Sequence, residues 1–263
     1  MSEVIDIPSF SADDKRIVDL MRAEQDDWPK KCFEAALTHL ASAYRIREID
    51  PAMAIFRAIT AEEEAATGLL RSLQLRQYPD SKKLRAKDHF HKAAVYPFIL
   101  AVIKHSSYLK INGVEKLGIG IPKDEENPRL VFALVLNGEN EGVVARPNPP
   151  LNFTFREGDD QKLPDYSEYL LKMIGPHGFD DVRHYLKEKA NERNRILYAS
   201  PQGLVQLDSV PDDYFVSQKN SVITILKTYL LIWPYSEIQP FVEEAIQAFL
   251  NLTGRLKNEL RQT

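Results

Sequence analysis

Residues 50–76 read DPAMAIFRAITAEEEAATGLLRSLQLR, and this stretch decides the fold. Asp50 can accept hydrogen bonds from the first free N–H groups of a helix, and Pro51 suits the first helical position because it has no N–H to leave unpaired. Few helix breakers follow, and a stripe with the three-to-four spacing of a buried helical face runs through Ile55, Ile59, Glu62, Ala66, Leu69 and Leu73. The sequence therefore predicts a central helix whose buried face carries a glutamate.

Helical patterns continue on both sides of this stretch. Ser11 and Asp14 have the spacing of a capping box, Pro29 suits a helix start, and Ser81 can cap a fourth helix. Pro97 can kink that fourth helix because it removes a backbone donor. Further helices are predicted over residues 11–26, 29–49, 81–110, 165–174, 180–200, 212–233 and 237–261. The fold class we expect is mainly α, a helical bundle.

The period of the apolar residues changes between residues 111 and 162. Leu117, Ile119 and Ile121 alternate with other residues, and residues 130–136 form an apolar run rich in β-formers. Asn137-Gly138 is a hairpin-turn signal. We predict a small antiparallel β insertion over about residues 111–162. About fifty residues make a marginal core alone, so we expect one α-helical domain, residues 1–263, that contains this insertion.

Composition limits the function classes. The net charge of −4 argues against a general nucleic-acid surface, although a local basic patch remains compatible with it. A single cysteine, Cys32, excludes an internal disulfide and a cysteine-rich zinc site, and its stripe predicts a buried position. Residues 1–10 lack a signal-peptide pattern, and the most apolar segment, residues 222–233, is too short to span a bilayer. We expect a cytoplasmic protein without membrane association.

Polar residues interrupt two of the apolar stripes. Asp88 and His91 are three residues apart and therefore share a face of the fourth helix, and Glu62 with Glu63 can occupy a matching place on the central helix. Buried charges must meet one another or a cation. Three interpretations are open: a structural hydrogen-bond network, a functional polar site, and a carboxylate–histidine metal site. The metal interpretation needs a repeated Glu-x-x-His pattern that is not found, so no metal or other cofactor is predicted.

A second constellation is RNRILY, residues 193–198. Asn194 and Arg195 precede Tyr198 by four and three residues and lie on its side of a helix, whereas Arg193 sits at the edge of that face. A guanidinium, an amide and a phenol together can hold a phosphate and stack on a base. The alternative is a helix end whose arginines neutralise Glu188, Glu192 or the acidic central helix.

RNRILY, together with the glutamate-bearing IFRAITAEEEAA of residues 55–66, resembles the HEPN superfamily, and its abortive-infection branches in particular. The mark of many of these proteins is an arginine–asparagine pair followed after three residues by a histidine. The resemblance covers the helical parts and leaves the β insertion unexplained. Arg193 and Asn194 match the pair, and Tyr198 stands at the histidine position. A phenol is a poor base at neutral pH, so this departure favours a lost or altered nuclease activity.

The resemblance implies a homodimeric helical bundle that cuts RNA without a metal, in bacterial antiviral defence. We therefore expect a HEPN-like protein that binds RNA or a nucleotide, with metal-independent ribonuclease activity as the further expectation. Arg193, Asn194 and Tyr198 are its predicted site, and Glu62 and Glu63, with Asp88 and His91, its supporting polar core. The rival interpretations are a non-catalytic helical interaction protein and a metal-dependent bundle enzyme.

Overall fold

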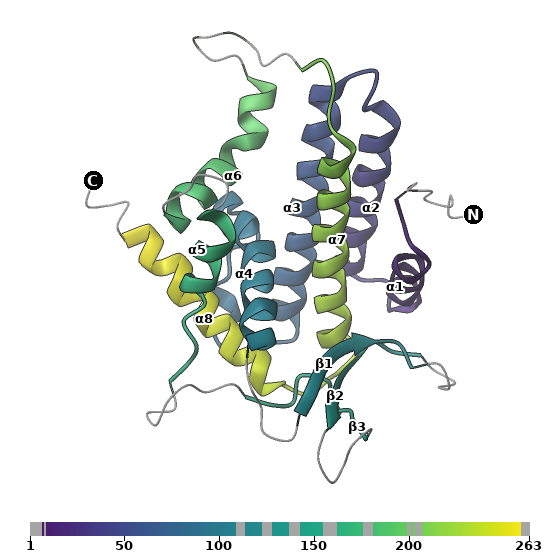
Figure 1. The fold of residues 1–263 in the computed structure, drawn as a ribbon, viewed down its shortest axis with the longest axis vertical. Coiled ribbons are helices and arrows are strands. Elements are labelled where there is room, and N and C mark those ends of the chain that lie inside the picture. The colour runs from purple at the N-terminus through teal and green to yellow at the C-terminus, as the bar shows by residue number, and fades with distance from the viewer. Residues whose placement is uncertain are drawn as a thin grey trace. The chain divides into compact units, whose positions relative to one another are not determined.

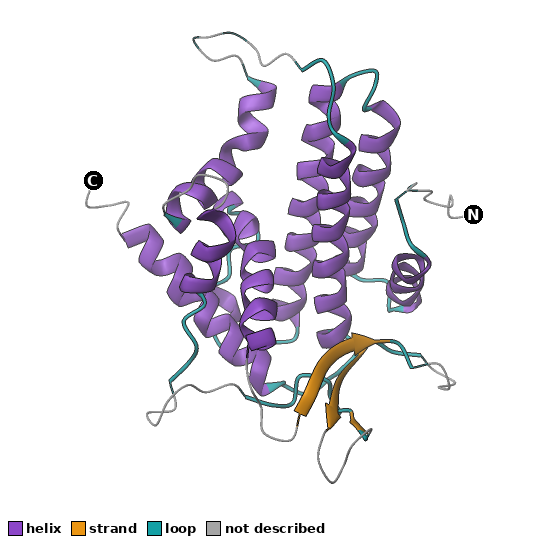
Figure 2. Ribbon diagram, viewed as in Figure 1, coloured by secondary structure: helices purple, strands orange, loops and turns teal. Residues whose placement is uncertain are grey.

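The computed structural model describes residues 7, 9–108, 114–122, 128–136, 143–154, 162–175, 181–198, 201, 203 and 207–258. Helices dominate this part of the chain, and strands are confined to one small sheet (Figure 2). The helices, labelled in Figure 1, are α1 (Ala12–Ala23), α2 (Trp28–Ile46), α3 (Pro51–Leu75), α4 (His89–Tyr108), α5 (Ser167–Ile174), α6 (Val182–Leu197), α7 (Asp212–Ile232) and α8 (Pro240–Asn258). The mainly α fold class with a small β insertion is confirmed.

The central helix α3 begins where the sequence predicts. The N–H of Met53 donates to Oδ1 of Asp50 at 3.0 Å, so Asp50 satisfies one of the free donors of the first turn. The buried face of α3 contains several alanines, which allow neighbouring helices to approach closely. Its buried apolar residues are Ala54, Ala58, Ile59, Ala61, Ala65, Ala66, Leu69, Leu70 and Leu73. A Cβ built on Gly68 would lie 2.9 Å from Cε2 of Phe33, which shows how tightly α2 packs here.

The first two helices also begin at their predicted caps. Ser11 and Asp14 form a capping box in which each side chain accepts from the other residue's backbone N–H. Asp27 caps α2 by accepting from the N–H of Lys30 at 2.9 Å, with Pro29 in the first turn. Cys32 lies in the buried face of α2, as predicted. Burial raises the pKa of its thiol to about 11, which leaves it protonated at neutral pH.

The start of α4 differs from the prediction. Ser81 begins only a short 3₁₀ helix, Ser81–Lys83, and the long helix starts at His89. Oδ1 of Asp88 accepts from the N–H groups of Phe90 and His91 at 2.9 and 3.2 Å, so Asp88 is the capping residue. The prediction missed this start because it assigned Asp88 to the interior of a longer helix.

The β insertion forms a three-stranded antiparallel sheet in the order β1-β2-β3. β1 (Val114–Gly120) pairs with β2 (Val131–Leu136), with Leu117 opposite Leu134, and β2 pairs with β3 (Val144–Ala145). The register of β1 against β2 shifts between Val114 and Lys116. The predicted turn at Asn137-Gly138 lies outside the described residues. Phe153, beyond β3, stacks on Phe241 of α8 with ring centroids 4.9 Å apart.

The chain forms two compact units. The first contains Met1–Arg71, Arg85–Tyr96 and Arg183–Leu226, and the second contains Ser72–Leu84, Pro97–Val182 and Lys227–Thr263. Helices α3, α4 and α7 each contribute residues to both units. The prediction of a single domain stays a prediction. No helix in the described part of the chain is long and apolar enough to cross a membrane.

Each unit has its own packing. In the first, Phe215 of α7 packs against Ala43, Ala54 and Ala58, and its ring lies 5.2 Å from that of Tyr44. In the second, the buried side chain of Gln239 accepts from the N–H of Leu151 at 2.8 Å and donates to the carbonyl of Leu231 at 3.0 Å. This amide fixes the chain after the sheet against the end of α7. The polar site described next lies within the first unit.

Candidate functional site

Two consecutive glutamates at the middle of α3 carry the main concentration of buried charge in the first unit. Glu62 and Glu63 are 5% and 7% exposed. Consecutive residues of an α-helix point about 100° apart, so the two carboxylates face different neighbours. The prediction placed both in a polar core, and their burial agrees with that part of it.

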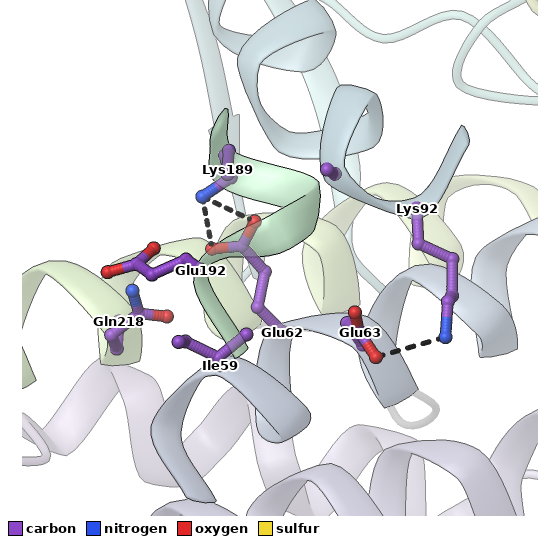
Figure 3. A pocket seen from close by; sticks show the side chains of 8 residues that line it. Ile59, Glu62, Glu63, Lys92, Lys189, Glu192 and Gln218 are labelled. Carbon is purple, nitrogen blue, oxygen red and sulfur yellow. Dashed lines mark hydrogen bonds and ion pairs between the residues drawn. The ribbon is translucent and has the colours of Figure 1, made fainter. Parts of the chain in front are cut away.

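Glu62 pairs with Lys189 of α6. Nζ of Lys189 lies 2.9 Å from Oε1 and 3.2 Å from Oε2 of the carboxylate (Figure 3). Burial by itself would lower the pKa of the Lys189 ammonium, but Glu62, Tyr185 and Glu192 outweigh it and raise the pKa. Lys189 is therefore charged throughout the physiological range, and the pair is a buried ion pair.

The carboxylate of Glu63 contacts three basic side chains. Its Oε2 lies 3.1 Å from Nζ of Lys92 and 3.3 Å from Nη1 of Arg193, and its Oε1 lies 2.7 Å from Nδ1 of His89. The Arg193 guanidinium also lies over the ring of Phe56, 5.7 Å from its centroid. Lys92 also acts on the neighbouring carboxyl of Glu64, so two cations and two carboxyl groups lie at this end of the cluster.

The spacing of these side chains explains how α6 contacts both glutamates and how α4 contacts Glu63 twice. Lys189 and Arg193 are four residues apart on α6, and His89 and Lys92 are three apart on α4, so each pair shares one helix face. Lys189 and Arg193 lie on the same face as the buried Val182, Leu186 and Ile196. Sequence reasoning missed Lys92 and Lys189 as partners. Their signal is a basic residue at an otherwise apolar stripe position.

Asp88 and His91, predicted as part of the supporting polar core, lie at the start of α4. Asp88 caps α4, and Nδ1 of the buried His91 accepts from the N–H of Arg85 at 3.2 Å. His89, which was not among the predicted site residues, is a direct neighbour of Glu63. The helix begins at residue 89, so Asp88 is not an inward-facing side chain of its interior.

The residues of RNRILY have different surroundings. The side chain of Arg193 is 28% exposed and tied to Glu63, whereas Asn194 and Arg195 are exposed and Nη1 of Arg195 lies 2.6 Å from Glu188. Tyr198, just after α6, is 67% exposed, and its N–H donates to the carbonyl of Asn194 at 3.0 Å. The structure thus places Asn194, Arg195 and Tyr198 at the surface, beside a partly covered Arg193.

A small cavity lies beside the Glu62–Lys189 pair, and Figure 3 shows the side chains around it. Its free volume is about 10 Å³, and it is lined by Ile59, Glu62, Glu63, Lys92, Ala93, Lys189, Glu192 and Gln218. Burial raises the pKa of the Glu192 carboxyl, and Glu62 adds to this effect, while Lys189 and Arg195 oppose it. Burial, Glu192 and Glu62 likewise raise the pKa of the nearby Tyr214 phenol.

The donor types at the cluster bear on metal binding. Lysine and arginine cations occupy the carboxylates of Glu62 and Glu63. Within the ranges that the structure describes, no three histidine, cysteine, aspartate or glutamate side chains gather closely enough to hold a metal ion.

Comparisons of this chain with protein-family models, with curated proteins and with solved structures find no match.

Proposed function

We propose that this chain is a HEPN-like protein that binds RNA or a nucleotide at the C-terminal end of α6. One observation carries the proposal. The ion pair between Arg193 and Glu63, 3.3 Å long, joins the two segments on which the resemblance rests, RNRILY and the glutamate-bearing α3. The resemblance was built on segments about 130 residues apart in sequence, and their meeting in one contact supports it.

The chemistry of the exposed residues supports a phosphate-bearing ligand. A guanidinium offers a planar fork of donors that matches phosphate oxygens, and Arg193 retains part of its surface for this contact. Asn194 can donate through its amide, and the exposed ring of Tyr198 can stack on a base. In the proposal, the motifs of two subunits of a homodimer face each other across the RNA.

Ribonuclease activity is the further step of the proposal, in a bacterial defence or toxin setting. A metal-independent cut at the ribose hydroxyl needs a group that accepts a proton at neutral pH. Tyr198 stands where the resemblance has histidine, and a phenol performs this step poorly. We therefore expect binding to be measurable and cleavage, if present, to be slow.

The test uses fluorescently labelled single-stranded RNA with wild-type protein and with Arg193→Ala. We expect anisotropy to report binding by the wild type at low salt, and Arg193→Ala to weaken it about tenfold because a phosphate contact is lost. Lys187→Ala is the matched control, since Lys187 is an exposed cation on the same helix. Gels run with a metal chelator present report cleavage.

Equal RNA binding by wild type and Arg193→Ala would contradict the proposed site, and no binding by either would contradict the function. Light scattering tests the homodimer, because one chain has a mass of 30.1 kDa and a dimer twice that value.

A non-catalytic helical interaction protein is the second candidate, and a specific observation favours it. Arg193 is already paired with Glu63, and Tyr198 is 67% exposed. This interpretation predicts that RNA binds neither wild type nor variant and that Arg193→Ala acts on stability alone. Elemental analysis of the purified protein for iron, manganese and zinc tests the metal-dependent alternative.

A further inference from the structure

The contact between Glu63 and His89 has the form of a carboxylate that orients an imidazole. Nδ1 of His89 lies 2.7 Å from Oε1 of Glu63, and a carboxylate held by the cations of Lys92 and Arg193 can only accept hydrogen bonds. The proton of the neutral imidazole therefore sits on Nδ1, which leaves the lone pair of Nε2 as an acceptor. A histidine in this tautomer can take a proton from a hydroxyl group.

The imidazole of His89 is accessible to a ligand. Its side chain is 43% exposed, although the Glu63 side chain that holds it is only 9% exposed. Nε2 of His89 has no hydrogen-bond partner among the residues that the structure describes. One ring nitrogen is thus fixed by the buried cluster, and the other remains available to a bound molecule.

The same carboxylate also holds the residue that is proposed to bind a phosphate. Oε2 of Glu63 lies 3.3 Å from Nη1 of Arg193, so the imidazole and the guanidinium contact the two oxygens of one side chain. In an RNA chain the 2′-hydroxyl and the phosphorus that it attacks belong to neighbouring atoms of one sugar. A base for the hydroxyl and a cation for the phosphate must therefore lie close together. Glu63 brings such a pair together from α4 and α6.

Other side chains around the cluster fit the role of a base less well. Tyr198 carries a phenol, which accepts a proton poorly at neutral pH. The largely buried ammonium of Lys92 is bound to Glu63 at 3.1 Å. Nδ1 of the buried His91 already accepts a backbone N–H at 3.2 Å. His89 combines an exposed imidazole, a fixed tautomer and a direct link to the phosphate-binding end of α6.

We propose that His89 is the general base of RNA cleavage and takes the place of the histidine that RNRILY lacks. This inference rests on the proposed function, because it needs RNA bound at Arg193. Nε2 of His89 accepts the proton of a ribose 2′-hydroxyl while the 2′-oxygen forms a bond to the adjacent phosphorus. The bond from phosphorus to the 5′-oxygen breaks, and the imidazolium returns its proton through solvent to that oxygen. The products are a 2′,3′-cyclic phosphate end and a 5′-hydroxyl end, and the step needs no co-reactant.

The experiment measures cleavage of end-labelled single-stranded RNA by excess full-length protein, with a metal chelator present, and identifies the product ends by mass spectrometry. We expect cyclic phosphate ends from the wild type and a rate about a hundredfold lower in His89→Gln. RNA affinity, measured by anisotropy, should stay nearly unchanged in this variant because Arg193 is retained. His184→Gln removes an exposed histidine of α6 and is the matched control that should cleave like the wild type.

Chemical rescue separates a base from a structural residue. His89→Ala removes an exposed imidazole, so imidazole added from solution can occupy its place beside Glu63. We expect added imidazole to restore part of the cleavage by His89→Ala in a saturable manner and to leave the rate of the wild type unchanged. Melting curves of the variants show that each is folded at the temperature of the assay.

The outcomes distinguish this inference from the function on which it rests. Equal cleavage by wild type and His89→Gln would overturn the role of His89 and leave the proposed function intact. RNA binding without cleavage by the wild type would do the same for the binding function. A folded His89→Ala that imidazole does not rescue would show that the ring acts through structure, which also overturns the assignment. Absence of RNA binding by the wild type would remove the proposed function and this inference together.

Discussion

The single residue on which the buried cluster most depends is Lys189. Its ammonium is the direct partner of Glu62, and both side chains are largely buried, at 19% and 6% exposed. Replacing one member of such a pair leaves the other charge buried without compensation, which costs more than the pair itself contributes.

We expect Lys189→Met to destabilise the fold by about 3 kcal/mol, measured by urea unfolding. Lys187→Met, at an exposed position of the same helix, should change stability by less than about 0.5 kcal/mol. The double variant Glu62→Gln/Lys189→Met should recover most of the loss because no uncompensated charge remains. Equal stability of the two lysine variants would show that Lys189 and Glu62 are not coupled.

Glu192 makes the opposite contribution at neutral pH. Burial, with the neighbouring Glu62, raises the pKa of its carboxyl in the folded state above that in the unfolded chain, so ionised Glu192 opposes folding. This cost is present above the folded-state pKa and disappears once the pH falls below the unfolded value of about 4.3.

Glu192→Gln should therefore be more stable than the wild type near pH 7, and the difference should vanish at about pH 4. Unfolding by urea at the two pH values measures it, with Glu188→Gln as the control that shows no gain near pH 7. A variant less stable than the wild type near pH 7 would mean that ionised Glu192 has a partner in the fold.

At the scale of the elements, the close approach of α2 and α3 makes a distinct prediction. Alanine is better than glycine in a helix by about 1 kcal/mol, but a Cβ at position 68 would lie 2.9 Å from Phe33 and 3.1 Å from the carbonyl oxygen of Pro29. Overpacking of this kind costs about 1–3 kcal/mol.

Gly68→Ala should therefore lower stability by about 1 kcal/mol in thermal or urea unfolding. Gly254→Ala in α8 is the control, because an added Cβ meets nothing there within 4 Å, and we expect a gain of about 0.5–1 kcal/mol. A stabilising Gly68→Ala would mean that α2 can move away from α3 at little cost.

The helix starts and the buried ion pairs show which features the sequence could predict and which it could not. Local caps placed the starts of α1, α2 and α3 correctly, because capping depends on residues within one turn. The start of α4 was missed because Asp88 also fitted a longer stripe. The position of Glu62 on an apolar face predicted a buried carboxylate, whereas Lys92 and Lys189 were not predicted as its cation partners or those of Glu63.

The cation partners escaped prediction for a physical reason. A long lysine side chain places its charge several ångströms from its backbone, so its position on a stripe does not reveal where the ammonium lies. Which helix supplies a partner to Glu63 is also a tertiary question, since Arg193 is separated from it by 130 residues. A helical stripe reports burial, and it carries no information about which neighbour covers it.

For the whole molecule, the question is whether the two compact units unfold separately. Helices α3, α4 and α7 each belong to both units, so melting one unit would break three helices partway along their length. Helix ends need new caps and solvated backbone groups, which makes such an interruption unfavourable.

We therefore expect one calorimetric transition in which the van't Hoff and calorimetric enthalpies agree. Lys189→Met, in the first unit, should lower the midpoint of that single transition without splitting it. Two resolved transitions, with only one displaced in the variant, would show that the units are independent and would contradict the prediction of a single domain.

The first unit is assembled from three separated stretches of the chain, and this has a consequence for its biosynthesis. Glu62 and Glu63 leave the ribosome long before Lys189 and Arg193, which follow 127 and 130 residues later. At roughly 5–20 residues per second, that interval lasts on the order of ten seconds. Glu63 can pair with Lys92 of α4, which follows only 29 residues later, but Glu62 has no cation until α6 emerges, so newly made protein must keep this part of α3 hydrated or shielded until then.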